Sequence, residues 1–157
     1  MTDHKCNGCA GHGLCHQVRA SSMLKVYLAG QYSIKEEIQV FAEQLRRVGV
    51  VVTSRWLEEE WPPDTQLHEV SDTEHAANAK RDFEDITTAN GMIFFSVSPQ
   101  HPTVRGGRHV EFGIALAMHK WVWVIGPREN IFHYLQSVVH FPTKEECLLA
   151  AMQYCAY

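Results

Sequence analysis

The sequence predicts a single α/β domain with a five-stranded parallel sheet, of the doubly wound type that includes flavodoxin-like and Rossmann-like folds. Short apolar segments alternate along the chain with longer segments of helical period. Strands that alternate with helices form a parallel sheet covered on both faces, and right-handed crossovers favour a flavodoxin-like order. A length of 157 residues suits one domain with a sizeable core.

The first third of the chain supplies two strands and one helix. Residues 24–29 form a short apolar strand, and 50–53 are β-branched enough for a second strand. Between them, 34–47 carries an apolar stripe of helical spacing with charged residues on the other face. The stripe consists of Ile34, Ile38, Phe41, Ala42 and Leu45.

A long connection follows, over residues 54–73, with Trp56, Trp61 and a proline pair. Long connections in compact domains are commonly binding loops or lids. A helix is then expected over about 74–89, and 92–95 is apolar enough to be a buried strand.

In the second half, a paired-glycine loop at 106–107 precedes a helix that runs to about residue 119, with Glu111 in its first turn. Strand 121–125, a short helix over 127–136 and an edge strand at 138–141 come next. Thr143 and Glu146 open the last helix with a capping-box pattern.

Composition excludes several classes of protein. The formal charge of −4 argues against a nucleic-acid polymer as partner. No apolar run approaches the ~20 residues of a membrane span, and the polar first twenty residues are unlike a signal peptide. We therefore expect a cytoplasmic protein with no membrane contact.

Residues 1–22 are expected to be a flexible leader rich in Cys, His and Gly, and residues 23–157 the α/β domain. Cys6, Cys9, Cys15 and His16 offer thiolates and an imidazole that could hold a structural zinc ion. The alternative is an oxidisable leader without metal. Cys147 and Cys155 fall on a helical pattern and are expected to act as small apolar residues.

The carboxyl ends of the strands are where an open parallel sheet binds ligands. Glu111 is expected there, held beside a glycine loop, although a carboxylate at a helix start can also merely complement the helix dipole. The strand ends also bring candidate ligand-binding residues to this edge. These are Gly30, Gln31, Ser33, Ser96, Gly107 and Arg108. The dinucleotide fingerprint is absent after the first strand, which disfavours NAD.

Three segments together resemble the nucleoside 2-deoxyribosyltransferase family, which includes deoxynucleoside 5′-monophosphate N-glycosidases. They are KVYLAG at 25–30, RDFEDITTANGMIFF at 81–95 and GGRHVEFGIA at 106–115. The resemblance covers about residues 24–140. It implies cleavage or transfer of the N-glycosidic bond of a 2′-deoxyribonucleoside or its 5′-monophosphate, without a catalytic cofactor, in a homo-oligomer.

The resemblance also implies residue roles. Glu111 would be the nucleophile that forms a covalent deoxyribosyl ester. Asp82 would assist protonation of the departing base or position the sugar, although Asp82 and Asp85 share a helical face that could simply be solvated. Tyr27 would orient Glu111 or be a core residue. Arg55 and Trp56 are candidates for stacking on the base, and Trp56 could equally be a packing residue.

Two positions depart from the family pattern. Arg105 stands where the transferases have an acidic residue that helps to bind the base, and Asn90 stands where an aspartate usually precedes the third strand. Arg105 and Arg108 would suit a phosphate or be solvated loop charges. The alternative to an enzyme is a non-catalytic module that senses or sequesters a nucleotide.

Overall fold

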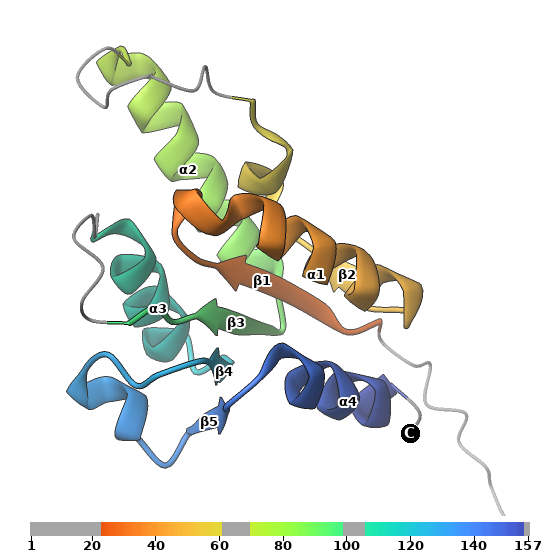
Figure 1. The fold of residues 1–157 in the computed structure, drawn as a ribbon. Helices are drawn as coiled ribbons and strands as arrows, with labels where there is room; N and C mark the ends of the chain where they lie inside the picture. The colour runs from red at the N-terminus through yellow and green to blue at the C-terminus, as the bar shows by residue number, and fades with distance from the viewer. Residues whose placement is uncertain (1–22, 61–69, 99–105, 156–157) are drawn as a thin grey trace, which may run out of the picture.

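The computed structural model describes residues 23–60, 70–98 and 106–155, which form one all-parallel sheet flanked by helices (Figure 1). The strand order is β2-β1-β3-β4-β5, which confirms the flavodoxin-like prediction. The strands are β1 Lys25–Ala29, β2 Val51–Val52, β3 Gly91–Phe95, β4 Trp121–Ile125 and β5 Val138–Phe141. The α-helices are α1 Lys35–Arg47, α2 Asp72–Thr88, α3 Gly107–Ala117 and α4 Lys144–Cys155. Short 3₁₀ turns are η1 Tyr32–Ile34, η2 Arg55–Glu58 and η4 Ile131–Tyr134.

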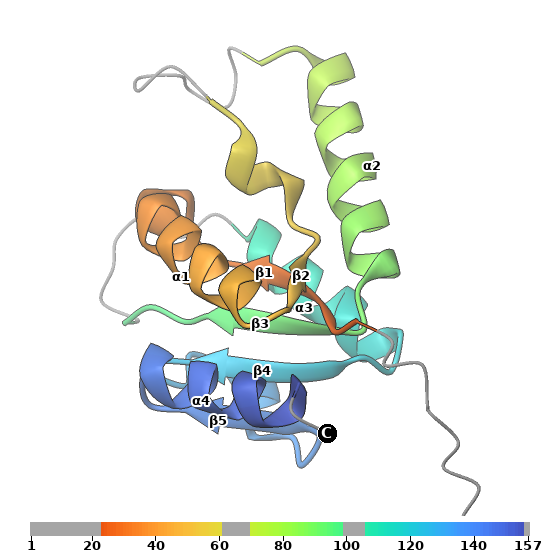
Figure 2. The same ribbon diagram turned by 90° about the vertical axis from the view of Figure 1, so that its right-hand side faces the viewer.

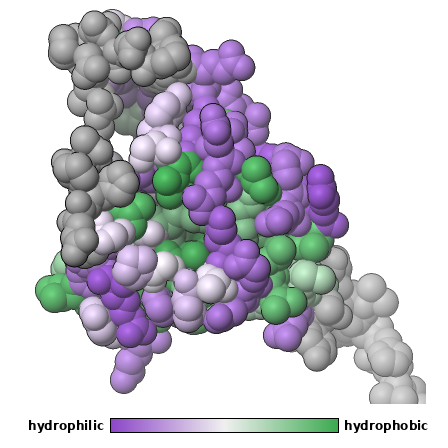
Figure 3. Space-filling view, in the orientation of Figure 1, coloured by the Kyte–Doolittle hydropathy of each residue, from purple (hydrophilic) through white to green (hydrophobic). Residues whose placement is uncertain are grey.

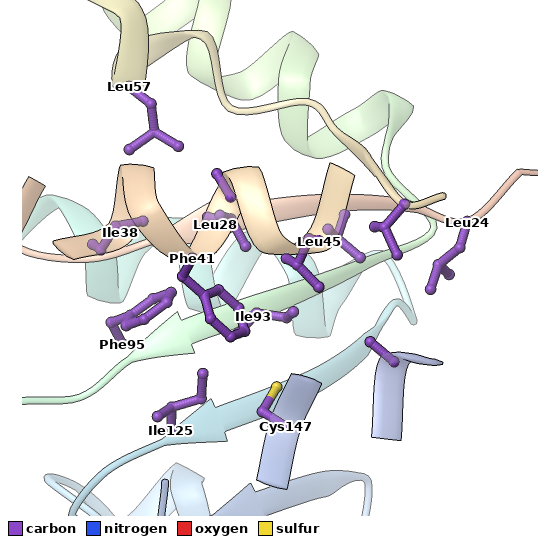
Figure 4. Packing of buried hydrophobic residues seen from close by; sticks show 14 residues of the cluster. Leu24, Leu28, Ile38, Phe41, Leu45, Leu57, Ile93, Phe95, Ile125 and Cys147 are labelled. Carbon is purple, nitrogen blue, oxygen red and sulfur yellow. The ribbon is translucent and has the colours of Figure 1, made fainter. Parts of the chain in front are cut away.

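The helices form two layers, with α1 and α4 on one face of the sheet and α2 and α3 on the other (Figure 2). Beneath α1 and α4, Phe41 packs edge-on against Phe95 at 5.4 Å between ring centroids. Cys147 lies in this layer as a fully buried apolar residue (Figure 4). The layer beneath α2 and α3 is built around Phe94 and Phe112. Burial on both faces explains why β3 is apolar at every position.

The direction in which the chain winds changes between β1 and β3, which are neighbours in the sheet although α1, β2 and α2 separate them in sequence. Tyr27 pairs with Met92, and Ala29 with Phe94. Such a reversal opens a crevice at the carboxyl ends of the two strands. The fold thus provides a binding position beside the end of β1.

Three local predictions need correction. Helix α3 begins at Gly107, so Glu111 lies beyond its first turn, where the helix dipole has little effect. Helix α2 begins at Asp72 and not near 74, because the Ser71 and Glu74 side chains form a capping box. The short helix expected over 127–136 is only the 3₁₀ turn η4.

The first turns of α2 extend beyond the sheet in Figures 1 and 2, and most of their side chains are exposed. The outer surfaces of α1 and α2 are mainly hydrophilic, with smaller apolar patches between them (Figure 3). Within the described residues, no helix is both long and apolar enough to span a bilayer.

Candidate active site

The central contact of the site joins β1 to α3. The Tyr27 hydroxyl donates a hydrogen bond to Glu111 Oε1 at 2.9 Å, across 84 residues of sequence. Tyr27 is fully buried in the middle of its strand, which fixes the hydroxyl. Glu111 is half-buried, so one carboxylate oxygen is oriented by the protein while the group still reaches solvent. The expected contact between the two residues is therefore present.

Burial raises the pKa of Glu111 to about 7, although the Tyr27 hydrogen bond pulls it down, and the negative charge of Asp82 adds to the rise. The pKa of Tyr27 is raised well above its usual value, first by burial and then by the charge of Glu111. Tyr27 therefore stays protonated at neutral pH and acts as a hydrogen-bond donor.

Asp82 lies on α2, close enough for its charge to raise the pKa of both Tyr27 and Glu111. Burial raises the pKa of Asp82 to about 6, against the opposing charge of Arg81. The charge of Asp82 raises the pKa of Glu111, and neighbouring carboxyl groups with raised pKa values are typical of acid–base sites. The structure thus brings Tyr27, Asp82 and Glu111 together from β1, α2 and α3.

Asp85, one turn along α2, has a different environment. It is 5% exposed and accepts hydrogen bonds from the Arg55 backbone N–H (2.8 Å) and side-chain Nε (2.7 Å). These bonds tie η2 to α2. The shared helical face of Asp82 and Asp85 is therefore turned inward and is not a solvated face, and Arg55 is committed to Asp85 and, at 3.2 Å, to Glu84.

Trp56 is a packing residue, the second of the two roles considered for it. Its indole N–H donates to the Leu28 carbonyl at 2.8 Å, and its ring packs against both apolar layers. These contacts hold η2 against the end of β1. They give Trp56 a structural role without a bound base.

Arg108, a candidate for binding phosphate, is paired with a carboxylate of the protein itself. It is 3% exposed and makes a bidentate pair with Glu129, with both N–O distances at 2.7 Å. Glu129 also accepts from the Ser96 hydroxyl (2.7 Å) and the Val97 N–H (2.8 Å). The cluster fixes the start of α3 to the end of β3. Burial alone would raise the pKa of Glu129, but these hydrogen bonds hold it below its usual value.

The turn after β1 contributes Gly30, Gln31 and Ser33. A Cβ atom at Gly30 would press on the tip of the Ile38 side chain and on Phe95 Cβ, so packing favours glycine there. Gln31 is 7% exposed, its carbonyl oxygen accepts from the Ser33 hydroxyl at 3.3 Å, and its amide nitrogen has no hydrogen-bond partner within the described residues. Gly107 has open space around it at the first position of α3.

Some expectations fall outside the described residues. These are the zinc ligands Cys6, Cys9, Cys15 and His16, together with Trp61 and Arg105. Across 23–60, 70–98 and 106–155, no group of three or more His, Cys, Asp or Glu side chains is arranged to hold a metal ion. Asn90 binds the Lys25 N–H through its side chain at 2.8 Å, at the amino end of the sheet and away from Glu111.

A hollow of about 730 Å³ lies between α3 and η4, lined mainly by apolar residues such as Phe112, Leu116 and Phe132. Its α3 residues lie on the side of the helix roughly opposite Glu111. Because neither Tyr27, Asp82 nor Glu111 lines it, this hollow is not the site of the carboxylates.

The sequence did not single out Glu59 or Glu129. Glu59 contacts Arg81 from the end of η2, and Glu129 follows the end of β4 after Gly126. The position of Glu129 at a strand's carboxyl end was a usable signal. Nothing in the local pattern around Glu59 distinguishes it from its neighbours Glu58 and Glu60.

Comparison with known proteins finds no matching family model and no similar curated sequence. Solved structures do match. The CMP N-glycosidase BcmB of Clostridium botulinum aligns over 83% of this chain and 99% of its own, with 21% identity and a TM-score of 0.54. The chain shares the fold of this enzyme.

Two further structures agree. A 2-deoxyribosyltransferase from Bacillus psychrosaccharolyticus aligns over 82% of this chain and 95% of its own, with 20% identity and a TM-score of 0.58. A conserved protein from Enterococcus faecalis aligns over 85% and 99%, with 15% identity and a TM-score of 0.58. At these identities the matches establish the fold that the sequence resemblance predicted.

Proposed function

We propose that this protein cleaves or transfers the N-glycosidic bond of a 2′-deoxyribonucleoside or its 5′-monophosphate, through a covalent intermediate on Glu111. The observation that carries the proposal is the Tyr27–Glu111 hydrogen bond, with Asp82 electrostatically coupled to both groups. The fold shared with an N-glycosidase and a deoxyribosyltransferase supports it.

In the first step, a Glu111 oxygen bonds to the anomeric carbon as the carbon–nitrogen bond breaks, and the bond's electron pair leaves with the base. Asp82 gives its proton to the departing base. In the second step, water or a second base attacks the anomeric carbon, Glu111 leaves as a carboxylate, and Asp82 takes the proton back. The chemistry needs no metal or redox cofactor.

The reactive form has Glu111 ionised and Asp82 protonated. Because the pKa of Glu111 is about 7 and that of Asp82 about 6, the single shared proton in the free enzyme favours Glu111. A difference of about one pH unit leaves roughly one reactive molecule for every ten with the proton misplaced. Whatever raises the proton affinity of Asp82 relative to Glu111 therefore increases the reactive population.

A 5′-phosphate would have to be bound without Arg108, which is 3% exposed and whose Nη1 and Nη2 atoms pair with Glu129. The start of α3 at Gly107 presents backbone N–H groups, which suit an anion. The Gln31 amide nitrogen, which has no partner among the described residues, is a further donor for a sugar hydroxyl or phosphate. These two groups favour a polar, anionic substrate end near the β1 turn.

The test is a panel of 2′-deoxynucleosides and their 5′-monophosphates, with released base measured by chromatography. Addition of a second free base separates transfer from hydrolysis. Wild-type protein should release base from at least one member, and Glu111→Ala should not. Binding without release by the wild type would favour the non-catalytic nucleotide-binding module instead.

We also propose a homo-oligomer. Ile131 and Tyr134 of η4 are 79% and 66% exposed, beside the apolar hollow between α3 and η4. When an apolar projection lies next to an apolar hollow on one face, the projection of each subunit can enter the hollow of the other about a two-fold axis. Sedimentation should show a dimer or larger species, and Ile131→Glu should give a monomer. A monomeric wild type would refute this assembly.

A further inference from the structure

Arg81, next to Asp82 on α2, lies between two carboxylates. Its Nη2 atom is in ion-pair contact with Glu59 Oε1 and lies 3.7 Å from Asp82 Oδ1. The side chains of all three residues are only about a fifth to a quarter exposed. A positive charge shared in this way acts less strongly on Asp82 than one paired with it alone.

Glu59 is held in place by other elements. The Lys35 ammonium, at the start of α1, donates to the Glu59 carbonyl, and the Glu59 N–H donates to the Trp56 carbonyl at 3.3 Å. Trp56 is in turn fixed to Leu28 of β1. The backbone of Glu59, which carries the carboxylate that faces Arg81, is thus positioned by α1, η2 and β1 together.

We infer that Glu59 is a positioning residue for this site, whose carboxylate holds the Arg81 guanidinium and so favours the protonated form of Asp82. The inference rests on the proposed function, in which Asp82 protonates the departing base. Glu59 acts on Asp82 through Arg81, which contacts both carboxylates.

Among the described residues, several charged or titratable groups from different elements interact with Asp82. Arg81 and Asp85 come from its own helix, Arg55 comes from η2, and Tyr27 and Glu111 come from β1 and α3. Arg55 is compensated by Asp85 at 2.7 Å and by Glu84. Of the two arginines, Arg81 lowers the pKa of Asp82 more than Arg55 does. The ion pair of Arg81 with Glu59 is therefore expected to affect the pKa of Asp82 more than the ion pairs of Arg55 do.

The direct test titrates the Asp82 carboxyl by NMR, with ¹³C-labelled aspartate and assignment through Asp82→Asn. Glu59→Gln keeps the shape of the side chain but removes its charge, so the Asp82 midpoint should fall, by about one pH unit. Arg81→Gln should raise it by a similar amount. The double variant Glu59→Gln/Arg81→Gln should return close to wild type.

Glu58→Gln is the matched control. Glu58 belongs to the same short turn, is 68% exposed and pairs with Arg46 of α1. Its removal takes away the same charge without touching Arg81, so the Asp82 midpoint should stay within about 0.2 pH units of wild type. Arg81→Lys, which keeps the positive charge, should also leave the midpoint close to wild type.

Turnover of the common 2′-deoxynucleoside 5′-monophosphates gives the second readout. Because Asp82 has the lower pKa of the pair, it sets the acid-side limb of the kcat/KM profile. Glu59→Gln should move this limb down by about one pH unit and lower the maximum about five- to tenfold. Arg81→Gln should move the limb up and raise the maximum by up to about fourfold.

A purely structural ion pair would lower activity in both single variants and would leave the Asp82 midpoint unchanged or shifted the same way in both. Either result would overturn the inference. Opposite shifts of the midpoint with no base release by the wild type would refute the glycosidic chemistry, and with it the catalytic role of Glu59, while the electrostatic coupling would stand.

Discussion

Glu111→Gln should stabilise the protein, and should do so increasingly as the pH rises. The glutamine keeps an oxygen that accepts the Tyr27 hydrogen bond but removes a carboxylate that the fold holds in a place unfavourable to its charge. Burial is the main cause of that penalty, because it raises the pKa of Glu111 to about 7.

The size of the effect comes from the difference between the folded pKa of about 7 and the ordinary value of 4.5. The native state binds the proton more tightly than the unfolded state, so wild-type stability falls as the pH rises from about 4.5 to 7 and levels off above. Linkage gives a cost of roughly 1 kcal/mol at pH 5 and roughly 3 kcal/mol at pH 8. Glu111→Gln removes this cost, which corresponds to a rise in Tm of roughly 6–12 °C at pH 8.

Urea denaturation of wild type and Glu111→Gln at pH 5 and pH 8 measures the difference. Glu58→Gln, at a side chain 68% exposed, is the control and should show no such dependence on pH. A stability difference between Glu111→Gln and wild type that is the same at both pH values would refute the reasoning, because Glu111 would then titrate normally.

Tyr27→Phe removes the hydrogen bond that lowers the pKa of Glu111, so the alkaline limb of the kcat/KM profile should move upward and its maximum should fall; an unchanged limb would contradict the role of Tyr27. Asp82→Asn should lower turnover of natural substrates by roughly 10²–10⁴-fold. The loss should be much smaller for an analogue whose base leaves without protonation. Equal losses on the two kinds of substrate would count against Asp82 as a proton donor. Glu129→Gln leaves Arg108 buried without a charged partner, and chemical denaturation should show a loss of about 3 kcal/mol; a loss below about 0.5 kcal/mol would mean that the pair contributes little.

The order of the sheet could be predicted because each strand is a short apolar segment between turn residues, and β3 is buried on both faces. The start of α2 could not be placed as well. Ser71 and Glu74 lie in a polar stretch that resembles a loop, and only the reciprocal bonds of the capping box show that the helix begins there. The predicted helix after Pro127 shortened to η4, whose N-cap is the Asn130 side chain.

The site, like the fold, contains some features that could be predicted from the sequence and others that could not. Glu111, Asp82 and Tyr27 could be singled out because their segments resemble a known family, and the structure places the Tyr27 hydroxyl in contact with Glu111. The contacts of Arg108 could not, since its partner Glu129 is 21 residues away and an arginine beside a glycine loop suits a phosphate equally well. The sequence left open a solvated face for Asp85 for a similar reason, because its partner Arg55 comes from a turn 30 residues earlier. Charge pairs between distant segments depend on the tertiary fold, which local pattern does not encode.

The central claim is that the Glu111 carboxylate bonds to the anomeric carbon of the sugar. Mass spectrometry of the protein, quenched in acid after mixing with a 2′-fluoro-arabino analogue of a substrate from the panel, tests it most directly, because the fluorine slows release of the ester. The account predicts a sugar adduct on the peptide that contains Glu111, and none on Glu111→Gln. Base release by the wild type without an adduct, together with turnover by Glu111→Gln at the wild-type rate, would contradict it.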